Sequence, residues 1–141
     1  MVTGGPEMGL AGQPTDEAIR RLVDRFYARA RRDALLGPVF ARAFGEDDAA
    51  WAAHLARLGD FWSSVMVRSG RYHGDPFSAH LHLPDIQPAM FERWLALWGE
   101  TARETLSGEA AANMVAKAER IAESLQLGMF FRLDGSRANA A

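Results

Sequence analysis

Two of the chain's four histidines stand two residues apart in the stretch DPFSAHLHLP, residues 75–84. Imidazole is a common metal ligand and a hydrogen-bonding group that titrates near neutral pH, so the pair could do either kind of chemistry. Asp75 is a good N-cap and Pro76 suits the first helical position, which predicts a short helix that Pro84 ends. The face on which each histidine lies then decides its role.

His80 and His82 lie on different faces of this predicted helix. Phe77 and Leu81 define its apolar face, and His80 takes the i+3 position on it, whereas His82 points about 140° away from Phe77. An inward His80 is either a core residue whose ring nitrogens are satisfied or the axial ligand of a haem iron, which projects from an apolar wall. The spacing alone leaves both readings open.

A third histidine, His54, falls inside the apolar arc of a long predicted helix. That arc consists of Trp51, Leu55, Leu58, Phe61, Trp62, Val65 and Met66. Tyr27 and Trp94 lie at the edges of the apolar stripes of two further helices. Each of these residues alone is readily explained as a core or rim residue. Together with His80 they would form a pocket with an axial ligand on one side and three hydrogen-bond donors on the other.

Helical periodicity runs through most of the chain and predicts the elements that carry these residues. The first helix starts near Thr15, and a compact corner follows in which Gly37–Pro38 limits helix to short turns. Asp47 or Asp48 caps the long helix that contains His54. Further helices contain residues 91–106 and about 109–131, separated by a break at Ser107–Gly108. Convincing period-two alternation is missing, so the predicted class is all-α.

Composition limits the domain organisation and the partners. A chain of 141 residues is long enough for one sizeable core, and we expect a flexible arm at 1–13, one domain at 14–132 and a flexible tail at 133–141. The net charge of −2 makes nucleic acid an improbable partner. Without cysteine, disulfides, thiolate nucleophiles and covalent haem attachment are excluded. Without a signal peptide or membrane span, we expect a cytoplasmic protein.

Five motifs, in order, resemble the bacterial truncated haemoglobins of the third group. They are FY at 26–27, LLGPVF at 35–40, WAAHLARLGDFW at 51–62, YHGDPFSAHLHLP at 72–84 and FERWLALW at 91–98. The resemblance extends over about residues 15 to 131. It implies a truncated globin, a two-over-two helical sandwich that encloses one non-covalent haem b. The chain lacks the glycine–glycine motifs of other truncated globins, as is common in this group.

The resemblance also assigns roles to individual residues. It implies that His80 is the proximal iron ligand, and that Tyr27, His54 and Trp94 stabilise the ligand on the distal side. It further implies that six residues lie over the haem, form the apolar walls of its pocket or pack behind those walls. They are Phe26, Leu58, Phe61, Trp62, Phe77 and Trp98. Arg68, Arg71 and Tyr72 are candidates for contacts with the haem propionates.

The family resemblance implies binding of dioxygen, nitric oxide and carbon monoxide at ferrous iron. Donors such as the Tyr27 hydroxyl and the Trp94 indole would hold the partly negative ligand, so release should be slow. Slow release fits redox chemistry, such as nitric oxide dioxygenation or a peroxidase-like reaction, better than bulk oxygen transport. Because the chain has no flavin or nicotinamide motif, electrons would come from a separate reductase. His54 acts either as a third donor or as a gate, and the sequence does not decide which.

Two alternatives remain at this stage. A haem-free helical sensor or interaction domain would use the histidines and tryptophans only as core residues. A zinc site formed by His73, His80 and His82 is disfavoured, because these residues come from a loop and from opposite sides of a short helix without a carboxylate at matching spacing. The chain has no GxSxG elbow and no glycine-rich phosphate loop before a helix.

Overall fold

The computed structural model describes residues 13–45, 47–68, 70 and 86–130 of the chain. Within these ranges the helices are α1 (Asp16–Arg32), α2 (Gly37–Phe44), α3 (Asp48–Val67), α5 (Pro88–Thr105) and α6 (Gly108–Phe130). The described part of the chain contains no strand. The prediction of an all-α protein is confirmed.

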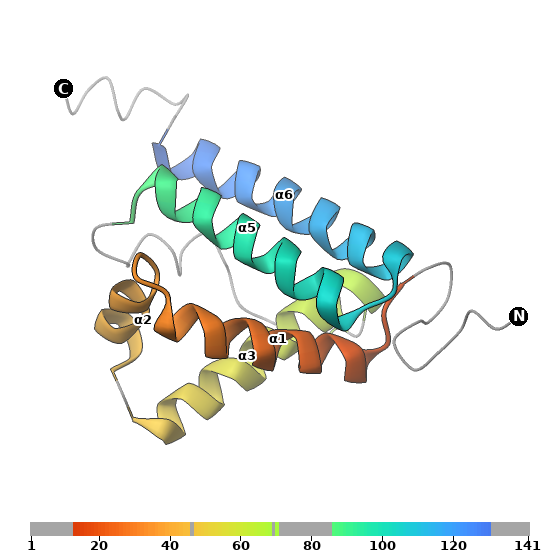
Figure 1. Cartoon of the computed structure of the whole chain (residues 1–141), viewed down its shortest axis with the longest axis horizontal. Coiled ribbons are helices and arrows are strands. Elements are labelled where there is room, and N and C mark those ends of the chain that lie inside the picture. The colour runs from red at the N-terminus through yellow and green to blue at the C-terminus, as the bar shows by residue number, and fades with distance from the viewer. Residues whose placement is uncertain (1–12, 46, 69, 71–85, 131–141) are drawn as a thin grey trace, which may run out of the picture.

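The helices form two antiparallel pairs, one lying over the other (Figure 1). α1 packs against α3 in one pair, and α5 packs against α6 in the other. α1 also contacts α5 and therefore joins the two layers, while the short α2 is attached to α1 at the end where α1 terminates. This arrangement is the two-over-two sandwich predicted from the sequence.

The helices begin where local capping chemistry allows. The Thr15 hydroxyl accepts a hydrogen bond from the Ala18 amide at 3.1 Å at the start of α1. The Asp47 carboxylate accepts one from the Ala50 amide at 3.0 Å at the start of α3. Both side chains satisfy amides that have no partner inside the helix. Of the two caps considered for the long helix, the structure uses Asp47.

The corner after α1 is more helical than predicted. Instead of short turns, α2 is a regular helix of eight residues that starts at Gly37. Pro38 lies in its first turn, where the missing amide hydrogen costs nothing, so this proline favours the start of a helix rather than interrupting one. Gly37 is needed for close packing, because a Cβ there would lie 2.6 Å from the carbonyl oxygen of Arg31.

The core forms where α1 meets the other helices. Its largest fully buried side chains include Trp98, Phe26, Ile19, Leu22 and Met114, which come from α1, α5 and α6. Burying side chains of this size stabilises the fold by roughly 1.5–3 kcal/mol each. α1 is therefore the central element of the sandwich, and residues on its buried face are held firmly.

α3 buries a second strip that the apolar pattern did not predict. Gly59 and Ser63 are buried on it, and a Cβ at Gly59 would lie 2.5 Å from a guanidinium nitrogen of Arg20 on α1. Arg20 also donates a 2.8 Å hydrogen bond to Asp60. The small residue thus lets α1 and α3 approach closely, and this leaves the predicted apolar arc of α3 free to face elsewhere.

None of the helices in the described ranges combines the length and apolar character needed to span a bilayer. The predicted arm and tail lie almost entirely outside the described residues, so the domain limits remain predictions.

Candidate functional site

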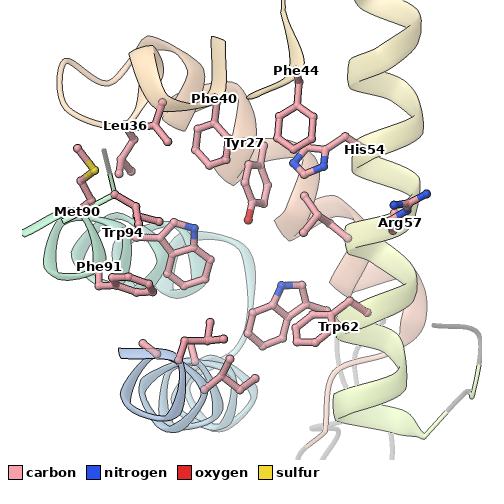
Figure 2. Close-up of a pocket in the computed structure, with 18 residues that line it drawn as sticks. Tyr27, Leu36, Phe40, Phe44, His54, Arg57, Trp62, Met90, Phe91 and Trp94 are labelled. Carbon is pink, nitrogen blue, oxygen red and sulfur yellow. The ribbon is translucent and has the colours of Figure 1, made fainter. Parts of the chain in front are cut away.

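A deep pocket lies between the two layers, and Figure 2 shows the side chains that line it. α1, α2, α3, α5 and α6 all contribute to its walls. Most of the lining is aromatic or aliphatic, and the α6 side consists only of Ala118, Ile121, Ala122 and Leu125. Such a cavity suits a large apolar ligand held by a few polar groups.

The three predicted hydrogen-bonding residues all line this pocket. Tyr27 comes from α1, His54 from α3 and Trp94 from α5. The Tyr27 and His54 rings lie 5.8 Å apart, edge to face. In Figure 2 the Tyr27 hydroxyl and the Trp94 indole nitrogen both point toward the interior of the cavity. Residues separated by up to 67 positions in the chain thus meet at one edge of the pocket.

Trp94 lies close enough to Tyr27 to act on its hydroxyl. Burial raises the pKa of Tyr27 well above its ordinary value, and the neighbouring Trp94 indole lowers that pKa in part. An indole N–H can only donate, so it favours negative charge on the Tyr27 oxygen. The Tyr27 hydroxyl nevertheless stays protonated at neutral pH and can donate to another group.

His54 is held by aromatic contacts rather than by polar ones. Its ring stacks on Phe44 with the centroids 3.8 Å apart and the planes at 29°. Burial, reinforced by the positive charge of Arg57, lowers the pKa of His54 from 6.5 to about 4. The buried Nε2 has no hydrogen-bond partner in the part of the chain that the structure describes. A neutral imidazole with a free nitrogen therefore faces the pocket, and buried polar atoms of this kind normally have a partner.

The predicted wall residues divide into two groups. Leu58, Phe61 and Trp62 line the pocket, as the apolar arc of α3 predicted. Phe26 and Trp98 do not line it and are fully buried behind it. These two residues can act on a ligand only through the side chains that they support.

Three tryptophans pack together at the pocket, and two of them, Trp62 and Trp94, belong to its wall. Trp98 stacks on Trp62 at a centroid distance of 4.7 Å and on Trp94 at 4.9 Å, with interplanar angles of 24° and 15°, while Trp62 and Trp94 lie 6.4 Å apart. Phe26 packs edge-on against Trp94 at 4.9 Å. Aromatic contacts at these distances contribute beyond the area that they bury. This cluster restrains the Trp94 indole in the wall of the pocket.

The sequence reasoning missed Arg57 and Phe44 as site residues. Arg57 is exposed, lines the pocket and forms no ion pair with another described residue. Arg57 lies three residues after His54 and therefore on the same face of α3. This i+3 spacing could have identified Arg57 as a site residue from the sequence. Phe44 comes from α2, which was expected to form only short turns.

Several predicted site residues lie outside the described ranges. These are Arg71, Tyr72, His73, Phe77, His80 and His82. Arg68, a candidate for propionate contacts, is described: it is the exposed C-cap of α3 in a left-handed conformation and does not line the pocket. Among the described residues, no group of three metal-binding side chains occurs, and the disfavoured zinc alternative involves only residues beyond them.

Comparison with known proteins gives one relative and one solved structure. No family model matches the chain. The chain is 34% identical over 119 residues to a protein named Group 3 truncated hemoglobin ctb from Campylobacter jejuni, which covers 84% of this chain and 93% of that protein. A crystal structure of a group III truncated hemoglobin from Campylobacter jejuni matches with a TM-score of 0.79 at 34% identity, covering 82% of this chain and 91% of the other.

Proposed function

We infer that this chain, which belongs to the group 3 truncated haemoglobins, holds one non-covalent haem b in the pocket between its two helical layers. Its function would be to bind dioxygen, nitric oxide or carbon monoxide at the ferrous iron. The observation that carries this proposal is the pocket itself, whose mainly apolar lining includes the hydrogen-bonding side chains of Tyr27, His54 and Trp94 from three different helices.

The residues present fit a haem. A porphyrin needs apolar walls on both faces and protection from water. The side chains from α6 and the arc of α3 provide such walls. The buried Nε2 of His54, which has no partner among the described residues, indicates that a polar atom of a ligand belongs beside it.

The polar edge of the pocket would act on the bound gas. Haem iron, when bound, supplies reversible binding of diatomic gases and makes the gas partly negative. The Tyr27 hydroxyl stays protonated, points into the cavity and can donate to that negative atom, and the Trp94 indole beside it offers a second donor. A hydrogen bond of this kind contributes about 1 kcal/mol, and more to a charged acceptor in a site without water. His54 is neutral at pH 7, so it takes part as a hydrogen-bonding group and not as a cation.

Arg57 would hold the haem edge. It lies at the rim of the pocket with its guanidinium exposed, and it forms no ion pair within the described ranges. A guanidinium can bind a carboxylate through two parallel hydrogen bonds, so a haem propionate is a suitable partner. Arg57 replaces Arg68 as the described candidate for this contact.

His80 remains the proposed axial ligand, from the helical-face argument and the family resemblance. The test is a titration of haem-free protein with haem, followed by the Soret band, for wild type, His80→Ala and His82→Ala. We expect His80→Ala to lose most of its haem retention and to change the ferrous spectrum, while His82→Ala behaves like wild type.

His82→Ala is the matched control, because it removes a histidine from the same segment. Equal losses in both variants, or a larger loss in His82→Ala, would contradict the assignment of His80. A wild-type chain that develops no Soret band would contradict haem binding altogether and would favour the haem-free sensor or interaction domain.

Tight hydrogen bonding of the gas points to redox chemistry. Donors that slow the release of dioxygen are a disadvantage for transport, whereas they help to polarise a bound oxygen or nitrogen oxide. Nitric oxide dioxygenation or a peroxidase-like reaction would suit this pocket, with electrons supplied by a separate reductase.

A further inference from the structure

An ion pair joins the end of α1 to α5 beside the pocket. The Arg93 guanidinium donates from Nε to Oδ1 of Asp33 at 2.7 Å, and one of its terminal nitrogens lies 2.7 Å from the same oxygen. The other carboxylate oxygen of Asp33 accepts hydrogen bonds from the amides of Leu35 at 3.1 Å and Leu36 at 3.0 Å. One carboxylate thus binds α1, the corner before α2, and α5 at the same time.

One partner of this ion pair is shielded and the other is not. The Asp33 side chain is only 8% exposed and both of its oxygens are used, whereas the Arg93 side chain is 47% exposed. Exposed ion pairs contribute little, but loss of Arg93 would leave the shielded carboxylate without its charged partner. The pair should therefore restrain the distance between the corner and α5.

The elements that the pair joins carry one end of the pocket. Leu36 lies at the end of the short segment that is bonded to Asp33, and its side chain lines the cavity. Met90 and Trp94 of α5 line the same cavity (Figure 2). Arg93 immediately precedes Trp94 in the chain. Trp94 of α5 and Tyr27 of α1 are neighbours in this pocket and belong to the same two helices that the ion pair links.

We propose that Asp33 and Arg93 are positioning residues that hold α5 in register with α1 and thereby set the position of the Trp94 indole beside Tyr27 in the ligand pocket. The effect on gas release rests on the function proposed above. Without the pair, the corner that carries Leu36 can move away from α5, and the Trp94 indole shifts relative to the Tyr27 hydroxyl.

A second ion pair between the same helices supplies a matched control. Arg29 of α1 binds Glu104 near the end of α5, where the Glu104 side chain is 43% exposed and does not line the pocket. Asp33→Asn and Glu104→Gln both replace a carboxylate by its amide in an ion pair between α1 and α5, and after the second change Arg29 still donates to Thr101 of α5 at 3.1 Å. Only the first breaks the link beside the pocket.

The experiment measures the surroundings of the Trp94 indole and the release of the gas. In the haem-free chain, a ¹⁵N–¹H spectrum shows the indole N–H signals of the four tryptophans, and a Trp94→Phe variant identifies that of Trp94. In the haem-loaded chain, stopped flow measures the dissociation of dioxygen. We expect Asp33→Asn to shift the Trp94 signal and to raise the dissociation rate about fivefold, the effect of weakening one neutral hydrogen bond. Glu104→Gln should change neither.

Arg93→Gln provides a second test, because it leaves the bonds from Asp33 to the backbone amides intact. Arg93→Gln should shift the Trp94 signal and raise the dissociation rate as expected for Asp33→Asn. It therefore tests the proposal even if the Asp33→Asn variant does not fold. A Trp94 signal and a dissociation rate that stay at wild-type values in Arg93→Gln would overturn the proposal, as would equal changes in Glu104→Gln. If wild type takes up no haem, the proposed function fails, while the indole signal still decides whether the ion pair sets the position of Trp94.

Discussion

Acidification should destabilise the haem-free chain through His54. Burial, together with the charge of Arg57, lowers the pKa of His54 from 6.5 to about 4. The unfolded chain therefore takes up a proton near pH 6.5, whereas the folded chain takes it up only near pH 4. The stability that His54 contributes is complete above pH 6.5 and is lost progressively as the pH falls through this window.

The size of the effect follows from the two pKa values. Between pH 7 and pH 5, a single group with this shift loses about 1.8 kcal/mol of its contribution to the free energy of unfolding. The imidazole is only partly buried, and solvent reduces such effects, so we expect a loss of about 1 kcal/mol. This is a measurable fraction of the 5–15 kcal/mol that is typical of a folded domain.

Urea unfolding followed by helical circular dichroism measures this loss. Wild type and His54→Gln are compared at pH 7 and pH 5, so that the titration of the other three histidines cancels in the difference. Wild type should lose about 1 kcal/mol more than His54→Gln over this range. An equal loss in both chains would show that the imidazole ring is accessible to protons in the folded state, and the account of a neutral His54 in the pocket would be wrong.

Two further predictions concern the pocket and the helix contacts that build it. Tyr27→Phe removes the hydroxyl donor and should raise the dioxygen dissociation rate of the haem-loaded chain about fivefold or more in stopped flow, and an unchanged rate would exclude Tyr27 from ligand binding. Gly37→Ala should cost about 1–3 kcal/mol in urea unfolding, because the added methyl group meets the backbone of Arg31. Gly59→Ala meets only the flexible end of Arg20 and should cost less than about 1 kcal/mol, and the reverse order would contradict the packing described here.

The helices could be predicted because the signals for them are local. Periodicity along α1 and the caps at Thr15 and Asp47 depend on residues within one or two turns, so the bounds were close to those observed. The helical content of the corner at Gly37–Pro38 was underestimated. A proline interrupts a helix in its interior, but it is favourable in the first turn of a new helix, which is where Pro38 lies. The strip of Gly59 on α3 was missed, because a small residue signals close packing only once the opposing helix is known.

The candidate site was predictable to the extent that its residues stand out by type. Tyr27, His54 and Trp94 are polar groups on apolar stripes, and the family resemblance brought them together. Asp33 and Arg93 are charged residues at a helix end and on an exposed face, and nothing local distinguishes them from solvated side chains. The two residues are 60 positions apart in the sequence and meet only in the folded chain.

The distribution of polarity in the pocket also bears on the residues that lie outside the described ranges. The donors come from α1, α3 and α5, whereas the α6 side offers only Ala118, Ile121, Ala122 and Leu125, which have no side-chain hydrogen-bonding atom. A haem held in this pocket would therefore meet hydrogen-bonding side chains from α1, α3 and α5 and only packing side chains from α6. The α6 residues could hold such a group only by apolar contact, so every polar contact with it or with a bound gas would have to come from other elements. A histidine ligand for the iron would likewise have to come from outside α6, and His80 is the residue proposed for that role.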